Sequence, residues 1–462
     1  MNFESFRNAR IIRSAWLERD GRRLDCNPYM SGALEASDAL DRLSVPKVQL
    51  KAVTSRIFHA GREARVWVQS EEFGIPFLGS SDIQSADFTS LPFMSKKQVR
   101  HHPAFTLGAK WTLITRSGTI GRMAFVRSDM DGMACSEHVL RVVPNESIIS
   151  PGFLYAFLSS KYGVPLVVSG TYGAIIQHIE PEHIAKLYLP RFGQAFEEHV
   201  SKLVETAAAH RTMASQKRAA AIQEITRLLN WTGLKHLKSC RTVSSTAMQS
   251  RMDAFYHSVP VAKGNKCLAS MSGQRLGELV ERVFEPNRGP RLKVEDADFG
   301  IPFLSSSAVF DVHPKGEYLI SKSRTADVTS LLVTSRDVLI PRSGQVGGII
   351  GRAVLPLAEN VGNAASEHLV RIRCHSEDDA AYLWAVFATE PGYWAVVGTA
   401  YGTSIPSLDS TLIADLFVPW LRAKDRKHIA LLAREAVKAQ GLGNQYETEA
   451  VRMVEERISE GR

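Results

Sequence analysis

The hydrophobic positions of this chain recur at helical spacing over two long segments. From 195 to 229 the sequence contains neither Gly nor Pro, and apolar or small residues return every three or four positions. This spacing predicts one helix with a narrow apolar seam, about 50 Å long at 1.5 Å per residue. The large apolar residues of this seam are Phe196, Val200, Leu203, Ile225 and Leu228.

A similar seam runs through 424–458, near the end of the chain. Gly441 and Gly443 interrupt it, so the sequence leaves open whether the distal helix is continuous, kinked or divided into a hairpin of two pieces. A narrow apolar seam must be covered by another surface, and the simplest cover is the other long segment. The pattern therefore predicts an antiparallel helix pair. The large apolar residues of the second seam are Ile429, Leu432, Val454 and Ile458.

Elsewhere the hydrophobic runs are short and bounded by Gly, Ser and Pro. "GIPFL", "WTLITRSG" and "EHVLRVV" have the branched and aromatic composition of strands. "PGFLYAFLSSKYG" and "AAYLWAVFATEPGYW" predict short helices that pack on the sheets, and "EPEHIAKLYLP" and "DSTLIADLFVP" predict a helical turn followed by a strand. These stretches together predict a mixed α+β fold.

The sequence also repeats itself. "FGIPFLGSSDI" returns as "FGIPFLSSSAV" 226 positions later (73 to 299), and the loop "LITRSGTIGR" returns as "LIPRSGQVGGIIGR" at the same interval (117 to 343). "CSEHVLRV" returns as "ASEHLVRI" after 230 positions (136 to 366), because the second loop is four residues longer. Such a long period indicates a duplicated domain. The predicted segments are an N-terminal segment at 1–22, a first domain at 23–192, a central helix at 193–236, a second domain at 245–420 and a distal helix at 421–462.

Composition and charge narrow the possible partners. The chain has 462 residues, of which 44% are hydrophobic and 23% charged, as in globular proteins with more than one core. We expect a cytoplasmic protein, because no signal peptide or membrane helix is evident in the sequence. The net charge of +8 favours a polyanionic partner such as nucleic acid. The five scattered cysteines predict neither a disulfide framework nor a zinc site.

The two serine-glycine loops have several interpretations. A catalytic serine needs a base, and Ser117 and Ser343 each have a histidine downstream, His138 and His368. However, the loops lack G-x-S-x-G and the Gly-Lys ending of a phosphate-binding loop. A tight hairpin flanked by arginines remains, suited to a groove or a phosphate, and a purely structural hairpin is nearly as well supported. We expect the "SEH" side chains to hold this loop, and we predict no catalytic or metal-binding residue.

A second pair of matched loops lies at Thr171–Gly173 and Thr399–Ser404. Aromatic, hydroxyl and glycine residues beside arginine are suited to contacts with DNA bases or backbone, or to locking the loop onto its own domain. The candidate DNA-binding residues of both loop pairs are Arg116, Ser117, Gly118, Arg122, Thr171, Tyr172, Gly173, Arg342, Ser343, Gly344, Arg352, Thr399, Tyr401, Gly402 and Ser404.

Taken together, these features resemble the specificity subunit of type I restriction-modification systems. The resemblance rests on "RLDCNPY", "GIPFLGSSDI", "LITRSGTIGR" and "SGTYGAIIQHIEPEHIAKLYLP" running into "GQAFEEHV", with their second-copy counterparts. It implies two duplicated α/β target recognition domains separated by two long antiparallel coiled-coil helices. Each domain would read half of a split site in double-stranded DNA, and the helices would set the spacer.

The resemblance also implies partners and a division of labour. Two adenine methyltransferase subunits would dock on the chain, and two translocase-endonuclease subunits would be recruited to cut unmethylated DNA. The chain would bind no cofactor, since S-adenosylmethionine, ATP and Mg would belong to its partners. Two alternatives remain open. One is a DNA-recognition subunit for a methyltransferase in another phage-defence assembly that lacks the endonuclease, and the other is a serine-dependent hydrolase with duplicated sites.

Overall fold

The computed structural model describes residues 14–15, 27–171, 178–234, 242–249, 251–271, 273–402 and 404–461. The chain divides into two compact units. Unit 1 comprises Met1–Thr212 and Leu442–Arg462, and unit 2 comprises Met213–Gly441. In the described part of the chain, no helix is both long and apolar enough to cross a membrane.

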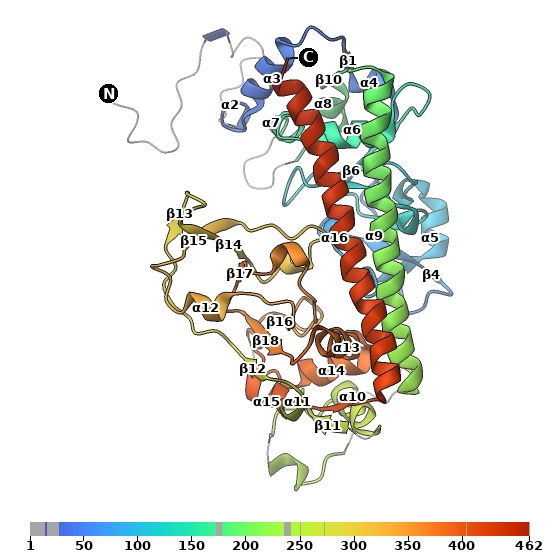
Figure 1. The fold of residues 1–462 in the computed structure, drawn as a ribbon. Coiled ribbons are helices and arrows are strands. Elements are labelled where there is room, and N and C mark those ends of the chain that lie inside the picture. Colours follow the sequence, from blue (N-terminus) through green and yellow to red (C-terminus); the bar gives the residue numbers. More distant parts are fainter. Residues whose placement is uncertain are drawn as a thin grey trace. The chain divides into compact units, whose positions relative to one another are not determined.

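The two long helices form much as the sequence predicts. Helix α9 spans Gln194–Leu228 and helix α16 spans Ala423–Ser459 (Figure 1). The sequence left the continuity of the distal helix open at Gly441 and Gly443, and in the structure α16 is continuous through both glycines. The reason for a glycine is clear at one of them: a Cβ at Gly443 would lie 3.0 Å from the carbonyl oxygen of Ala207 on α9. Gly443 therefore permits close helix approach, and packing outweighs its poor helix propensity.

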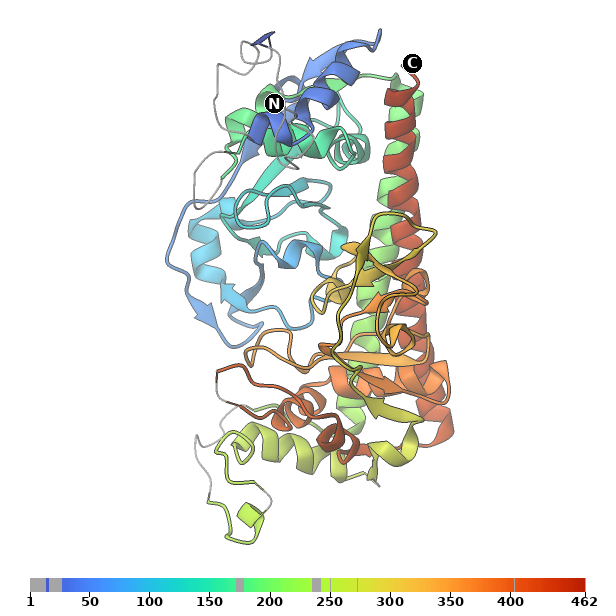
Figure 2. The ribbon, with the colours of Figure 1, turned by 90° about the vertical axis from the view of Figure 1, so that its left-hand side faces the viewer.

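The seams of α9 and α16 meet each other inside each unit, and the two helices lie side by side in both views (Figures 1 and 2). The pairing is antiparallel, because the first half of α9 packs with the last half of α16 in unit 1, and the reverse holds in unit 2. The buried seam residues in unit 1 are Val200, Val204, Ala450, Val454 and Ile458, and those in unit 2 are Ala221, Ile225, Ile429, Ala430 and Ala433. The half-buried seam residues are Phe196, Leu203, Leu228 and Leu432.

The described part of unit 1 contains three small sheets, with strand orders β2-β9-β6-β7, β3-β5-β4-β8 and β1-β10. Its strands are β1 (Lys47–Gln49), β2 (Thr54–Phe58), β3 (Trp67–Val68), β4 (Gly74–Leu78), β5 (Phe93–Ser95), β6 (Thr112–Thr115), β7 (Met123–Phe125), β8 (Ala134–Cys135), β9 (Val139–Pro144) and β10 (Tyr188–Pro190). Its shorter helices are α2 (Asn27–Met30), α3 (Ala33–Asp41), α4 (Leu50–Val53), α5 (Lys96–His101), α6 (Pro151–Leu158), α7 (Gly163–Ser169) and α8 (Pro181–Lys186).

Unit 2 contains sheets with strand orders β12-β18-β16, β13-β15-β14-β17 and β11-β19. Its strands are β11 (Gly273–Arg275), β12 (Arg282–Phe284), β13 (Lys293–Val294), β14 (Gly300–Leu304), β15 (Tyr318–Ser321), β16 (Asp337–Pro341), β17 (Ala364–Ala365), β18 (Leu369–Arg373) and β19 (Phe417–Pro419). Its shorter helices are α10 (Val259–Ala269), α11 (Leu276–Leu279), α12 (Val328–Leu331), α13 (Glu377–Ala388), α14 (Glu390–Gly398) and α15 (Ser410–Ala414).

Matching strands pair in matching registers in the two units. Phe77 of β4 pairs in parallel with Ala134 of β8, as Phe303 of β14 does with Ala364 of β17. Successive residues of a strand face opposite sides of its sheet, so Phe77 and the next residue, Leu78, enter different hydrophobic clusters. The short helices and terminal strands predicted from "PGFLYAFL", "EPEHIAKLYLP" and their counterparts are confirmed as α6, α8, β10, α13, α14, α15 and β19.

Candidate nucleic-acid interface

The first serine-glycine loop is the tip of a hairpin between β6 and β7. These strands pair antiparallel, and the amide of Thr115 donates to the carbonyl of Arg122 at 2.9 Å. Gly118 (φ 76°) and Gly121 (φ 82°) both have left-handed backbone conformations. A Cβ at Gly121 would also lie 2.7 Å from a methyl group of Val168 on α7. The glycines therefore turn the chain and seat the loop against its own unit.

The second serine-glycine loop is seated against its own unit through an equivalent glycine, but its tip is longer. Gly351 (φ 74°) donates from its amide to the carbonyl of Pro341 at 3.1 Å, and a Cβ there would clash with Val397 on α14. The stretch 345–348 is exposed. At its start, Gln345 donates from its side-chain amide to the backbone carbonyl of Ser404 at 3.0 Å. The longer loop thus reaches the second matched loop of the same unit.

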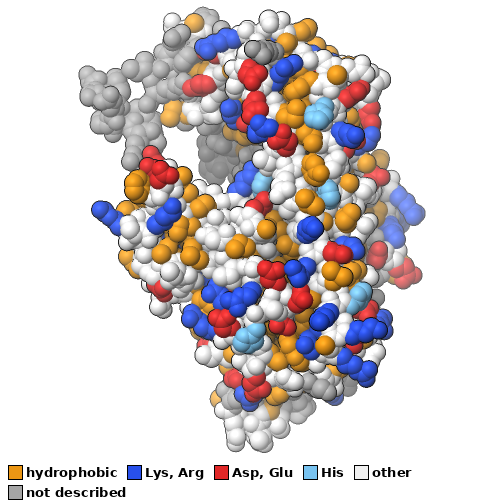
Figure 3. Space-filling view, viewed as in Figure 1, with side chains coloured by type: hydrophobic (Ala, Val, Ile, Leu, Met, Phe, Trp, Pro, Cys, Tyr) orange, Lys and Arg blue, Asp and Glu red, His pale blue; other side chains and the backbone are white. Residues whose placement is uncertain are grey.

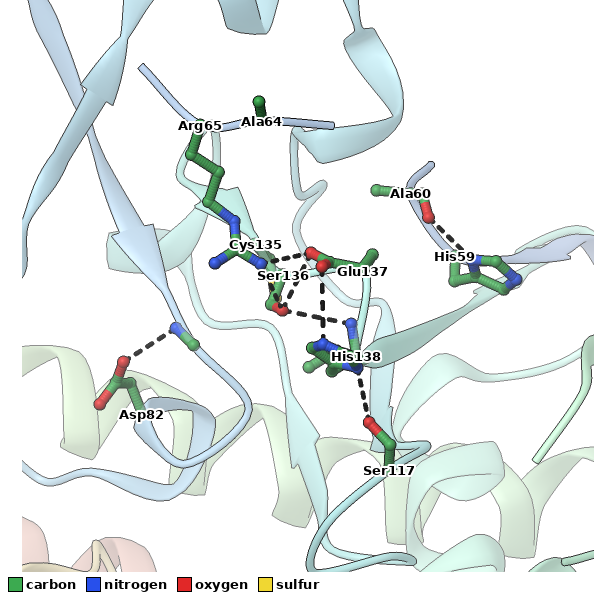
Figure 4. A network of polar contacts seen from close by, with 12 residues as sticks. His59, Ala60, Ala64, Arg65, Asp82, Ser117, Cys135, Ser136, Glu137 and His138 are labelled. Carbon is green, nitrogen blue, oxygen red and sulfur yellow. Dashed lines mark hydrogen bonds and ion pairs between the residues drawn. The ribbon is translucent and has the colours of Figure 1, made fainter. Parts of the chain in front are cut away.

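In unit 1 the side chain of Ser117 contacts a short polar chain (Figure 4). Its Oγ lies 2.6 Å from Nδ1 of His138, and Nε2 of His138 lies 3.5 Å from Oε1 of Glu137. The amide of Arg116 also donates to the carbonyl of His138 at 2.9 Å. The expectation that the "SEH" strand tip holds the loop is therefore confirmed in unit 1.

Glu137 also binds an arginine from the opposite side (Figure 4). Its Oε2 accepts from the guanidinium of Arg65 and lies 3.3 Å from Oγ of Ser136. Burial raises the pKa of Glu137, but the hydrogen bond and charge of Arg65 outweigh this and leave the pKa below its usual value. The Arg65 guanidinium in turn lies 4.8 Å from the ring centroid of Phe77. Glu137 is thus held ionised between the sheet and the loop.

In unit 2 an arginine again contacts a glutamate and a phenylalanine, but the loop serine has a different partner. Arg291 donates to Glu367 at 3.1 Å and lies 4.5 Å from the ring centroid of Phe303. Ser343, however, contacts Oγ of Ser407 at 2.8 Å. The two units therefore share an arginine-glutamate-phenylalanine framework but hold their loop serines differently.

A buried arginine supports the strand tip beneath each loop. Arg141 is fully buried and donates to the backbone carbonyls of Cys135 and Ser136 at 2.6 and 2.8 Å. Arg371, equally buried, donates to the carbonyl of Ala365 at 2.8 Å. Burial lowers the pKa of both guanidinium groups. These donors satisfy carbonyls that would otherwise be buried without partners.

The loop arginines differ in accessibility. Arg116 is buried and donates to Glu180 at 2.6 Å, and Arg342 is half-buried with Glu285 at 2.8 Å. Arg122 is exposed and Arg352 is half-buried. A guanidinium already paired with a carboxylate has less charge to offer a phosphate, so Arg116 and Arg342 are placed to position their loops.

The structure describes only part of the second pair of matched loops. Tyr172 and Gly173 lie outside the described residues. Thr171 and Thr399 are both buried, and the Thr399 hydroxyl donates to the carbonyl of Val396 at 2.7 Å. Tyr401, Gly402 and Ser404 are exposed beside the longer loop. The roles of all these candidates in DNA contact remain predictions.

An open pocket of about 540 Å³ lies beside the first loop in unit 1. Its walls combine charged, hydroxyl and aromatic side chains. The lining residues are Glu63, Arg65, Trp67, Phe77, Gly79, Ser80, Ser81, Ser136, Glu137 and His138. Among the described residues, no group of three or more His, Cys, Asp or Glu could hold a metal ion.

Sequence reasoning missed Arg65, Arg141 and their counterparts in unit 2. A signal was present, because Arg65 and Arg291 are 226 positions apart and Arg141 and Arg371 are 230 apart, the intervals of the repeat itself. The net charge of +8 does not appear as one patch on the face in Figure 3, where basic and acidic side chains are interspersed.

Comparisons with known proteins give matches only among solved structures. No family model matches the chain, and no curated protein matches it. The S subunit of a type I restriction-modification system from M. genitalium aligns over 90% of this chain and 95% of its own, with 10% identity and a TM-score of 0.34. The HsdS subunit from Thermoanaerobacter tengcongensis aligns over 89% and 96%, with 13% identity and a TM-score of 0.29. A structure concerning complex assembly and conformational transition of the type I R-M system aligns over 90% and 98%, with 13% identity and a TM-score of 0.28. Type I restriction-modification S subunits are thus among the solved structures to which this chain is similar.

Proposed function

We propose that this chain is a DNA-recognition subunit that reads a bipartite target in double-stranded DNA, one half-site per unit. The observation that carries the proposal is the repeated framework around the two serine-glycine loops. Arg65, Glu137 and Phe77 in unit 1 match Arg291, Glu367 and Phe303 in unit 2. A repeated framework with different loop tips is what two readers of different half-sites require.

The helix pair supplies the second part of the proposal. Two readers joined by a stiff connection bind as one intramolecular step after the first contact, so only half-sites at the matching separation are favoured. The paired helices α9 and α16 would serve as that connection and as the docking surface for two adenine methyltransferase subunits. S-adenosylmethionine, ATP and Mg would be bound by partner subunits, and the chain itself would carry out no chemistry.

The test is to co-express the chain with a partner adenine methyltransferase and to map modified adenines across the host genome. The proposal predicts methylation within one motif made of two specific halves and an unspecified spacer. Methylation without sequence preference would contradict it. Co-purification separates the two forms of the proposal, because a translocase subunit in the complex indicates a restriction system and its absence indicates a different phage-defence assembly.

A serine hydrolase is the second candidate, favoured by the contact between Ser117 and His138 at 2.6 Å. Two observations weigh against it. Ser117 is buried, and Ser343 contacts Ser407 in place of the equivalent histidine. Replacing Ser117 with alanine and assaying a reactive ester decides the question, since a nucleophilic serine predicts loss of hydrolysis, whereas unchanged or absent hydrolysis ends this alternative.

A further inference from the structure

The pocket in unit 1 has two half-exposed residues on its wall. The Glu63 side chain is 43% exposed and Trp67 is 48% exposed. The ring of Trp67 packs edge-on against Phe77, with centroids 5.2 Å apart. The indole is thus fixed in orientation while one part of it remains accessible to a ligand.

Comparison with unit 2 separates the fixed part of the pocket from the variable part. The 226- and 230-residue intervals place Arg, Phe, Ser, Glu and His at equivalent positions in both units. Two lining positions differ in charge, because Gly289 stands in place of Glu63 and Lys293 in place of Trp67, and a third differs only in size, with Ser305 in place of Gly79. Lys293 has its ammonium 4.0 Å from the ring centroid of Tyr318, so it also lies on an aromatic support. The arginine-glutamate-phenylalanine framework is thus the same in both units, whereas the residues at the positions of Glu63 and Trp67 differ.

The chemistry of these residues favours a base edge over a phosphate. Glu137 in the pocket wall is already paired with Arg65, so the exposed carboxylate of Glu63 is the one that would repel a phosphate and accept a hydrogen bond from an exocyclic amine. Only cytosine and adenine offer an amine in the major groove. The accessible indole adds an apolar surface against which a base can pack. In unit 2, a lysine at the equivalent position offers a donor, which is suited to the acceptor edge of guanine.

We propose that this pocket is the base-reading subsite of unit 1, that it takes an amine-bearing base edge of cytosine or adenine, and that Glu63 and Trp67 select that base. The proposal rests on the proposed function, because it assigns the residues by which one unit distinguishes its half-site.

The test exchanges the two accessible residues for those of unit 2. The Glu63→Gly, Trp67→Lys double variant is co-expressed with the adenine methyltransferase, and methylated adenines are mapped as for the wild type. We expect one cytosine or adenine position of a single half-site to change or relax, with methylation of the original motif reduced about ten-fold or more. The other half-site and the spacer stay as they are. The reciprocal Gly289→Glu, Lys293→Trp variant should alter only the other half-site.

A matched control changes the same residue types outside the pocket. Glu71 and Phe73 are exposed and are absent from the pocket lining, so the Glu71→Gly, Phe73→Lys variant should keep the wild-type motif. An unchanged motif in the Glu63→Gly, Trp67→Lys variant overturns the inference, and so does uniform loss of methylation in a variant that still folds and binds the methyltransferase. A wild-type chain without any sequence preference contradicts the proposed function instead, so the two failures are distinguishable.

Discussion

Arg211 on α9 donates from its guanidinium to the side-chain carbonyl of Asn444 on α16 at 2.9 Å, and both residues are buried in unit 1. Arg211 also pairs with Glu447, which accepts a hydrogen bond from the hydroxyl of Tyr155 at 3.0 Å. This polar cluster lies within the mainly apolar seam of unit 1. A polar residue in such a seam fixes the register of paired helices, because any shift leaves it buried without a partner.

The first prediction concerns this cluster. Replacing Arg211 with methionine keeps the length of the side chain but removes its hydrogen bonds to Glu447 and Asn444. We expect the free energy of unfolding to fall by about 3–5 kcal/mol, as for a broken buried ion pair. The control is Lys217→Met, which removes a half-exposed pair with Glu435 and should cost no more than about 1 kcal/mol. Urea unfolding measures both, and equal losses would contradict the assignment.

The two glycines of α16 should respond differently to alanine. A Cβ at Gly441 meets open space, so Gly441→Ala should stabilise the helix by about 0.5–1 kcal/mol through propensity alone. A Cβ at Gly443 lies 3.0 Å from both the Ala207 carbonyl oxygen and Cγ of Arg211, so Gly443→Ala should gain less or destabilise the protein. Thermal unfolding compares the variants. Equal gains would show that the helices do not approach closely at Gly443.

We expect the buried Arg141 to be required for the stability of the strand tip that holds the first loop. Arg141→Met leaves the carbonyls of Cys135, Ser136 and Val139 without this donor, and we expect a loss of about 3 kcal/mol or more in the free energy of unfolding. Arg100→Met on the exposed surface of α5 serves as the control and should change stability little. A similar result for both variants would mean that the loop is held by other contacts.

The pH dependence of unit 1 should include a contribution from Asp129. Burial raises the pKa of Asp129, but the charge and hydrogen bonds of Arg127, with the hydroxyl of Thr212, lower it below its usual value. The ionised carboxylate therefore stabilises the folded state at pH values above its ordinary pKa near 4, and this stabilisation is lost as the pH falls through the lowered pKa. The difference in Tm between wild type and Asp129→Asn should be large at pH 7 and shrink towards pH 3.

The measurement is thermal unfolding of both proteins across this pH range. Glu71→Gln, which removes an exposed carboxylate, controls for the change in net charge. A difference in Tm that stays constant down to pH 3 would show that Asp129 makes no ionised contact of this kind.

Much of the architecture could be predicted because its signals are local. The absence of Gly and Pro from 195 to 229 and the periodic seam locate α9, but the predicted central helix at 193–236 extended too far, because α9 ends at Leu228. The repeated strings locate both hairpin loops, since their glycines are needed for left-handed turns against Val168 and Val397. The continuity of α16 could not be predicted, because it depends on the surface of α9 that faces Gly443.

The chemistry around the loops was less predictable than the loops themselves. Arg65 lies far from Glu137 in sequence, and their pairing depends on the sheet β3-β5-β4-β8, because Arg65 precedes β3 and Glu137 follows β8. The same holds for Arg116, whose guanidinium is buried and paired with Glu180, a residue 64 positions away. Local sequence marks where a loop turns, but it does not reveal which side chains remain accessible.

The most direct test of two linked readers is to map methylated adenines for a chain with seven residues inserted in each long helix. The insertions are placed between Thr212 and Met213 and between Gly441 and Leu442, where the helices pass from one unit to the other. They leave intact the contacts within unit 1 and the 2.7 Å bond between Arg218 and Gln440 in unit 2. An insertion of seven residues, two helical turns, keeps the apolar seam in phase. It lengthens each helix by about 10 Å, which corresponds to up to about three base pairs of DNA. The account predicts the same two half-sites with a longer spacer, whereas altered half-sites or an unchanged spacer would contradict it.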